Sequence, residues 1–155
     1  MKRRTFLAAA GAAFVLPAHA HHGWSSFDQE RPLYLRGRVA KVMWANPHVE
    51  FDLAVPADLA LPPDLAKRVV PAQSAPVDGP AMLARTSLPT RKAPTWRVEL
   101  APLPRIEAWK IERLKEGETV EVVGFGFVDA KPGAILRAEF LFRGGKAYGL
   151  RSSPA

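Results

Sequence analysis

The sequence predicts a small, mostly β domain: a barrel of five or six strands with one short helix, preceded by a segment that is cleaved. Several short runs alternate apolar and polar side chains, as strands with one buried face do. A helical pattern that begins at Pro104 separates two groups of these runs. The length of 155 residues suits one domain, which can bury a core without disulfides or metals.

The first twenty residues are typical of an export signal. Three basic residues at 2–4 precede an uncharged run at 6–16, which is too short to span a bilayer as a helix. The small residues that end at Ala20 suit a signal peptidase. We therefore expect cleavage after Ala20 and a periplasmic domain of residues 21–155 without a transmembrane anchor. The Arg-Arg-Thr-Phe-Leu string favours twin-arginine export, and the general secretory route is the alternative.

Two strands and a turn are predicted early in the mature domain. Residues 33–44 alternate as one long, bent strand, and a slip of the pattern near Val42 indicates a β-bulge. The Asn-Pro pair at 46–47 predicts a turn, because the residue before a proline disfavours helical backbone. Residues 48–55 alternate again and predict the second strand.

Residues 56–94 interrupt this pattern and contain 8 of the 15 prolines. We interpret the segment as an insertion with one or two helical turns at most. A long loop in a small domain is either functional or disordered, and this composition favours disorder.

Regular patterns return after the insertion. They predict, in chain order, a strand at 95–100, a helix at 104–114, strands at 119–127 and 134–142, a tight turn at 143–146 and a last short strand at 147–150. Gly124 would ease a kink in the fourth strand. Three strands, a helix and two more strands is the order of the OB fold, a small Greek-key barrel. The predicted fold is therefore an OB-like barrel, which implies no activity by itself.

Composition and motifs argue against several functions. The chain has no Cys, which removes disulfides, thiolate metal sites and thiol nucleophiles. Loss of the signal would lower the formal net charge from +7 to +4, too little for the dense cationic surface that binds nucleic acid. The sequence has no nucleophile elbow, zinc-protease helix or phosphate loop. An enzyme is therefore the weaker prediction.

Five short strings carry a family resemblance. They are His-His-Gly-Trp at 21–24, Gly-Arg-Val at 37–39, Trp-Ala-Asn-Pro-His at 44–48, Trp-Arg-Val-Glu-Leu at 96–100 and Leu-Lys-Glu-Gly-Glu-Thr-Val at 114–120. Together they resemble a family of small exported bacterial proteins of unknown function. The resemblance covers most of the mature chain outside the insertion and implies the fold and the compartment, but no activity. The insertion departs from the family pattern, and Glu50 and Asp52 occupy positions expected to vary.

Three histidines of the mature chain are candidate metal ligands: His21, His22 and His48. Cleavage after Ala20 would give His21 a free α-amine beside its imidazole, a chelate that favours Cu(II). His22 or His48 could supply a third nitrogen, as in the histidine brace of copper proteins. Cleavage one residue earlier would also leave a terminus that binds Cu(II). The alternative is that the leading histidines bind nothing and that His48 is a structural residue of the turn or core.

Trp24, Trp44, Asn46 and His48 are candidates for binding a protein partner or a small ligand. Aromatic rings near the mouth of a barrel can stack on a flat ligand, and polar groups beside them fix its orientation. The alternative for the tryptophans is packing in the core. That alternative applies to all four tryptophans of the chain, at positions 24, 44, 96 and 109.

Two functions are compatible with these residues. The first is a non-catalytic periplasmic binding module that recognises a protein partner or small ligand near Trp44 and His48, with the insertion as a cover or tether. The second is a periplasmic copper-binding accessory protein, with Cu(II) as its cofactor. His48, Glu50 and Asp52 share one strand face, which could hold a metal or an acid–base pair, or could simply face solvent.

Overall fold

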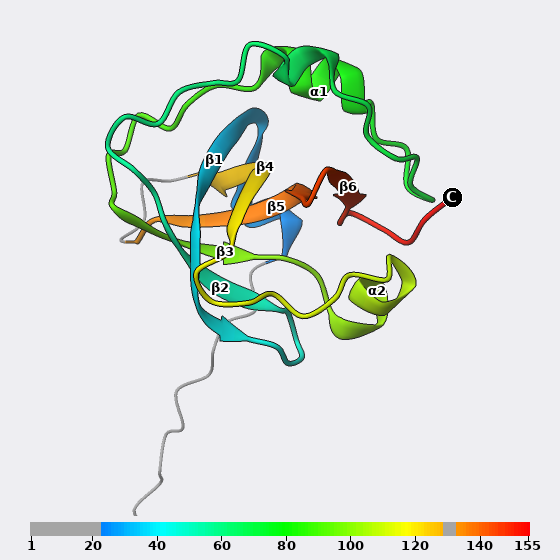
Figure 1. Ribbon diagram of the computed structural model, residues 1–155. Helices are drawn as coiled ribbons and strands as arrows, with labels where there is room; N and C mark the ends of the chain where they lie inside the picture. Colours follow the sequence, from blue (N-terminus) through cyan, green and yellow to red (C-terminus); the bar gives the residue numbers. More distant parts are fainter. Residues whose placement is uncertain (1–22, 129–132) are drawn as a thin grey trace, which may run out of the picture.

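Figure 1 shows a β barrel with a long segment arched over it. This computed structural model describes residues 23–128 and 133–155, so the predicted signal at 1–20 lies outside the described residues. The described elements are the 3-10 helices η1 (Trp24–Ser26) and η2 (Leu65–Lys67), the α-helices α1 (Gly79–Arg85) and α2 (Leu103–Ala108), and the strands β1 (Phe27–Met43), β2 (Glu50–Ala54), β3 (Thr95–Glu99), β4 (Thr119–Phe127), β5 (Ile135–Arg143) and β6 (Lys146–Gly149).

Five strands close into a ring. β1 pairs antiparallel with β2 on one side and with β4 on the other. β3 pairs antiparallel with β2 and parallel with β5, and the β4–β5 pair completes the ring. β6 pairs with the second half of β5. The ring order β1-β2-β3-β5-β4, with α2 between β3 and β4, is that of an OB-like barrel. The predicted fold class is therefore confirmed.

Two predicted irregularities lie where the sequence pattern slips. The β1–β2 register shifts between Ala40 and Met43, around the predicted bulge. The β4–β5 register shifts between Val123 and Gly124. A Cβ atom at Gly124 would overlap the carbonyl oxygen of Arg137, so the two strands can approach this closely only at a glycine.

The barrel encloses the main core. Leu35, Phe51, Val98, Val122 and Leu136 come from the five barrel strands, and each is fully buried. Alternating side chains point into the barrel from every strand, as the period-two pattern predicts.

The helix after β3 is shorter than the predicted 104–114. It ends at Ala108, and Lys110 then adopts a positive φ of 53°, a conformation that an α-helix does not continue through. Ile111 and Leu114 still reach the main core, but from irregular backbone. In Figure 1 α2 lies beside the lower end of the barrel.

Residues 56–94 form an ordered cover on the outside of the barrel. Figure 1 shows their first arm crossing above the barrel toward the C-terminus. There the backbone N–H of Ser74 donates to the carbonyl of Ser153 at 2.9 Å. The second arm returns through α1, where the Asp78 carboxylate caps the helix by accepting from the N–H of Ala81 at 3.0 Å.

The prediction of disorder for this insertion is wrong, because the barrel has a second apolar surface. Its strands place Phe125 and Phe140 in a second buried cluster, distinct from the main core. Leu65, Met82 and Leu83 of the insertion are buried in the same cluster. The apolar residues of the insertion are few, but they remove an apolar face of the sheet from water.

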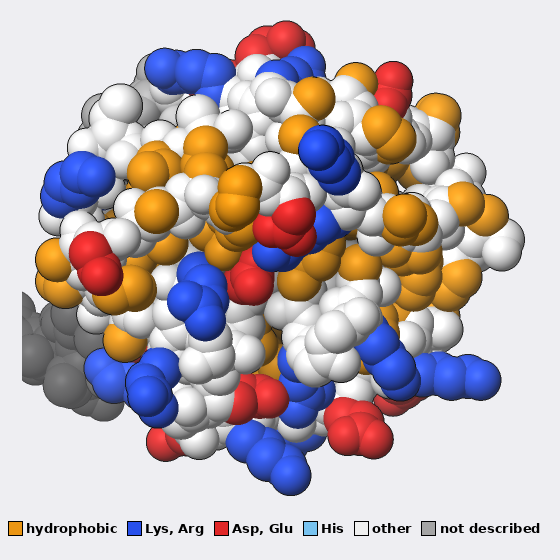
Figure 2. All heavy atoms as spheres, turned by 45° about the horizontal axis from the view of Figure 1, so that its top comes forward, with side chains coloured by type: hydrophobic (Ala, Val, Ile, Leu, Met, Phe, Trp, Pro, Cys, Tyr) orange, Lys and Arg blue, Asp and Glu red, His pale blue; other side chains and the backbone are white. Residues whose placement is uncertain are grey.

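The surface above the barrel carries mixed charges. Figure 2, with the insertion turned forward, shows cationic, acidic and apolar side chains interspersed over this face. Among the residues that the structure describes, no helix has the length and apolar character needed to cross a membrane.

Candidate functional site

The turn after β1 carries three of the four residues predicted to bind a ligand: Trp44, Asn46 and His48. Trp44 is half-buried against the main core. The Asn46 side-chain oxygen accepts a hydrogen bond at 3.1 Å from the backbone N–H of Leu103, the first residue of α2. The first N–H groups of a helix have no partner within the helix, so this bond satisfies one of them. Asn46 therefore fastens the turn to α2.

Trp24 lies before β1, at the other end of that strand. Its ring contacts the Arg151 guanidinium, 3.7 Å from the ring centroid, and the edge of Phe125, with centroids 6.3 Å apart. Trp24 packs on the second apolar cluster, whereas Trp44 packs on the main core. The structure therefore separates the two tryptophans, and neither they nor Asn46 and His48 line the cavities described below.

The predicted metal ligands are described only in part. His21 and His22 lie outside the described residues. His48 is half-buried and has contacts of its own within the fold. Within residues 23–128 and 133–155, no group of three or more His, Cys, Asp or Glu side chains is arranged to hold a metal ion.

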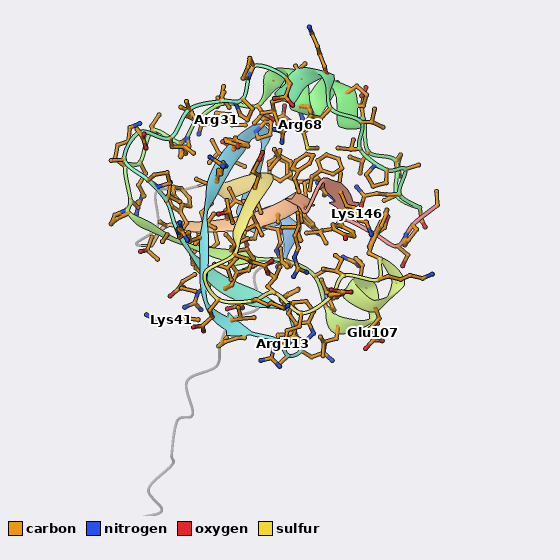
Figure 3. The ribbon with its side chains drawn as sticks, viewed as in Figure 1. Arg31, Lys41, Arg68, Glu107, Arg113 and Lys146 are labelled. Carbon is orange, nitrogen blue, oxygen red and sulfur yellow. The ribbon has the colours of Figure 1, made fainter. Side chains whose placement is uncertain are left out.

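The outer face of β2 and β3 carries a ladder of ion pairs that is partly buried. The Arg97 guanidinium bonds to Asp52 at 2.7 Å and to Glu50 at 3.1 Å. Lys41, which Figure 3 labels, approaches Asp52 at 3.5 Å. Burial by itself would raise the pKa of Asp52, but the hydrogen bond and charge of Arg97 outweigh it and lower that pKa. Because cations engage both carboxylates, the face suits a structural ladder better than a general acid.

Two further ion pairs lie deeper on β5. Arg137 pairs with Glu99 at 3.1 Å, and the fully buried Glu139 pairs with Arg151 at 2.8 Å. Gln73 of the insertion also donates to Glu139 at 3.1 Å. Burial raises the pKa of Glu139, while Arg151 and Gln73 act in the opposite direction. These bonds hold the insertion and the C-terminal residues to the barrel.

A mostly apolar cavity of about 440 Å³ lies between the two ends of the insertion, where they join the barrel. Residues 55–57 and Leu59, which follow β2, form one wall, and residues of the segment 88–94, which precedes β3, form the other. The buried Trp96 completes the lining. Arg91 and Lys92 are the charged residues of that lining. The volume lies within the roughly 300–1,000 Å³ of small-molecule sites.

Backbone hydrogen bonds fix both ends of the second wall. The N–H of Ser87 donates to the carbonyl of Pro32 at 3.0 Å, and the N–H of Tyr34 donates to the carbonyl of Ser87 at 2.9 Å. At the other end, the N–H of Val55 donates to the carbonyl of Pro94 at 2.9 Å. Residues 88–93, which we call the strap, therefore span two anchored points, and the cavity is part of the fold.

A more polar cavity of about 280 Å³ adjoins the first. The strap residues Leu88 and Arg91, together with Trp96, line both cavities. Asp28 and Arg31 line the polar cavity and pair with each other at 2.6 Å. Figure 3 shows Arg31 near the insertion, above the barrel.

Sequence reasoning missed this site because it predicted disorder for the strap. The core alternative for Trp96 is confirmed, since this residue is 4% exposed and belongs to the main core. The available signal was local: two adjacent cations, Arg91 and Lys92, stand between two prolines just before a strand whose second residue is Trp96. Only the return path of the insertion places them beside a cavity.

Comparison with known proteins finds one family model that matches part of the chain, and it indicates no activity. Residues 10–60 match the model of a family of unknown function, DUF6152. The matched residues include β1, the turn and β2, but not the strap or Trp96. No curated protein and no solved structure matches the chain. The resemblance to a family of unknown function is confirmed over these residues. That residues 1–20 are an export signal, and that the paired histidines and the Trp-x-Asn-Pro-His string are features of the family, remain predictions.

Proposed function

We propose that this protein is a non-catalytic binding module of the periplasm that takes up a small ligand in the cavity beside Trp96. The observation that carries the proposal is the construction of the cavity: an apolar lining between the end of β2 and a strap anchored at Ser87 and Pro94. Within residues 23–128 and 133–155, no His, Asp, Glu or hydroxyl side chain lines the cavity, which favours binding over catalysis.

This proposal moves the binding site away from the Trp44–His48 turn. Asn46 bonds to the start of α2, and Trp44 packs on the main core, so both support the fold. The cavity offers concave apolar surface of the size that small ligands need. The two ends of the insertion then form the two walls of the site, which is a more specific role than that of a cover or tether.

The neutral fluorescent probe N-phenyl-1-naphthylamine tests the site. We expect its fluorescence to rise when it binds the wild-type protein. Ala93→Trp, which fills the cavity from the strap, should abolish that rise, and Ala57→Trp should do so from the opposite wall. Ala84→Trp adds the same ring on an exposed position of α1 and is the matched control.

One result of that titration would overturn the proposal. If wild type, Ala93→Trp and Ala57→Trp bind the probe equally, and circular dichroism shows that both variants are folded, the probe binds elsewhere. Loss of binding in Ala84→Trp as well would also count against it.

Export is the second part of the proposal, and it is supported by the sequence of residues 1–20. N-terminal sequencing of protein from fractionated cells should find His21 first, in the periplasmic fraction. Met1 retained in the cytoplasmic fraction would contradict export. Replacing Arg3 and Arg4 by lysine should block the twin-arginine route, and continued export of this variant would indicate the general secretory route.

Copper binding at the mature N-terminus is a second proposed function, favoured by the contacts of Trp24. Its ring is held by Arg151 and Phe125. A residue spans at most about 3.6 Å of chain, so an α-amine at His21 would be tethered within about 11 Å of the Trp24 Cα. Such a tether would keep a chelating terminus close to the barrel.

Copper titration of the processed protein tests this second function. One extra residue before His21 should abolish Cu(II) binding if the α-amine is a ligand. An affinity for Cu(II) that is unchanged by the added residue would exclude the histidine brace. In His48→Ala, weaker Cu(II) binding with an unchanged melting temperature would identify His48 as a ligand. A lower melting temperature with unchanged Cu(II) binding would identify it as a structural residue.

A further inference from the structure

We propose that the ligand of the Trp96 cavity is an anionic amphiphile: a free carboxylate that carries a single apolar chain. This inference rests on the proposed function and names its ligand class. It is carried by the juxtaposition of an apolar cavity with two cations of the strap, Arg91 and Lys92.

The apolar part of the ligand follows from the lining. Val55, Leu59 and Leu88 contribute aliphatic surface, and Trp96 adds an indole ring. Val55 and Leu59 also pack against the main core, so the cavity is continuous with apolar packing of the barrel. A polar ligand would lose its hydration here without gaining hydrogen bonds, whereas an alkyl chain gains by leaving water.

The anionic part follows from the sign of the charges at the cavity. Arg91 and Lys92 are exposed residues that line it, and none of the described residues of its lining carries a carboxylate. Arg91 also lines the adjoining polar cavity, so this cation stands where the apolar and polar spaces meet. In that polar cavity the charge of Arg31 is offset by Asp28, at 2.6 Å. The head group of a chain held in the apolar cavity would therefore emerge beside Arg91 and Lys92, the cations of the strap that line the cavity.

A cationic amphiphile would meet the opposite conditions. Its head group would lie beside two like charges, and like charges at short range repel. A neutral alcohol of the same chain length would gain the apolar contacts alone. For ligands with the same alkyl chain, the expected affinity for the cavity is therefore highest with a carboxylate head group, lower with an alcohol and lowest with a quaternary ammonium.

Displacement of N-phenyl-1-naphthylamine from the wild-type protein tests this ranking. The competitors are decanoate, decanol and decyltrimethylammonium, each below its micelle-forming concentration. We expect decanoate to displace the probe at the lowest concentration. Each methylene group buried adds about fourfold in affinity, so decanoate should bind about 15-fold more tightly than octanoate.

Neutralising the strap cations tests the head-group contact. Arg91→Gln/Lys92→Gln should weaken decanoate binding roughly three- to tenfold, the range of two exposed charge contacts, and should leave decanol unchanged. Lys67→Gln/Lys115→Gln removes the same total charge at exposed positions outside the cavity and is the matched control. Decanoate binding by the wild type, and not decanol binding, should weaken as salt rises.

The outcomes separate this inference from the proposed function. If decanol equals decanoate and Ala93→Trp blocks both, the cavity binds ligands but the anionic class is wrong. If nothing displaces the probe and the tryptophan variants change nothing, the proposed function itself fails. Binding of anionic vesicles in preference to free decanoate would make a lipid surface the partner and would also overturn this inference.

Discussion

The guanidinium of Arg151 lies 3.7 Å from the ring centroid of Trp24, although the two residues stand at opposite ends of the described chain. The same guanidinium pairs with the buried Glu139 at 2.8 Å and donates to the Gln29 side chain at 2.7 Å. One arginine near the C-terminus thus joins the start of the domain to the barrel. The contact between a cation and an indole ring stabilises a fold most when it is shielded from water.

Replacing this arginine should destabilise the whole domain. Arg151→Ala leaves the Glu139 carboxylate buried without its cation, so we expect the free energy of unfolding to fall by about 3–5 kcal/mol in urea denaturation. Arg113→Ala, at an exposed arginine, should change it by no more than about 0.5 kcal/mol. A loss below about 1 kcal/mol for Arg151→Ala would show that the pair does not hold the fold together.

The Asp52–Arg97 pair predicts a loss of stability in acid. Arg97 lowers the pKa of Asp52 from its ordinary value of 3.8, so the folded protein holds this carboxylate ionised more strongly than the unfolded chain does. The stabilisation is present above the unfolded pKa and disappears as pH falls through the folded one. Between pH 5 and pH 2, wild type should therefore lose more stability than Asp52→Asn.

Thermal melting across that pH range is the measurement. Asp58→Asn, which removes one carboxylate at an exposed position, is the control and should follow the wild-type profile. Parallel melting curves for wild type and Asp52→Asn would mean that Arg97 does not select the ionised carboxylate.

Gly124 should tolerate no side chain, whereas its neighbour on the same face should. The Cβ of Gly124→Ala would overlap backbone atoms of Arg137 and Ala138, which cannot move aside cheaply. We expect a loss of about 1–3 kcal/mol or more. At Gly126 the nearest atom to a Cβ is a Leu33 methyl at 3.5 Å, an ordinary contact, so Gly126→Ala should change little. Equal unfolding midpoints for the two variants would contradict the described β4–β5 register.

The barrel could be predicted from the sequence because apolar and polar side chains alternate along its strands, as they do in strands with one buried face. The fourth strand has the predicted bounds, the third ends one residue earlier than predicted, and the fifth is shifted by one residue at both ends. The first strand begins earlier than predicted, at Phe27, because Phe27 pairs with Phe127 of β4 across a register shift that ends at Pro32. Chain order alone then led to the ring of an OB-like barrel.

The cover and the cavity could not be predicted, because they depend on contacts distant in sequence. Val123 directly follows the inward-facing Val122, and Phe140 directly precedes the inward-facing Leu141, so these strands are apolar on both faces. That signal predicts a second layer, yet it does not say which segment supplies it. The insertion supplies it with Leu65 and, 17 residues later, the adjacent pair Met82 and Leu83, a pattern without periodicity.

Asn46 should affect stability and leave ligand binding intact. Asn46→Ala removes the acceptor of the Leu103 N–H at the start of α2, which should cost about 0.5–2 kcal/mol, the range of lost helix caps. Affinity for N-phenyl-1-naphthylamine should stay at the wild-type value. Asn46→Asp, which keeps the oxygen acceptor, should restore most of the stability. Weaker probe binding with unchanged stability would instead indicate that the ligand binds at the Trp44–His48 turn.

A crystal structure of the protein grown with decanoate tests the central claim most directly. We expect the alkyl chain between residues 55–59 and the strap, in contact with Trp96, and its carboxylate at Arg91 or Lys92. A cavity without decanoate, in crystals where the ligand occupies the Trp44–His48 turn or another surface, would contradict the account.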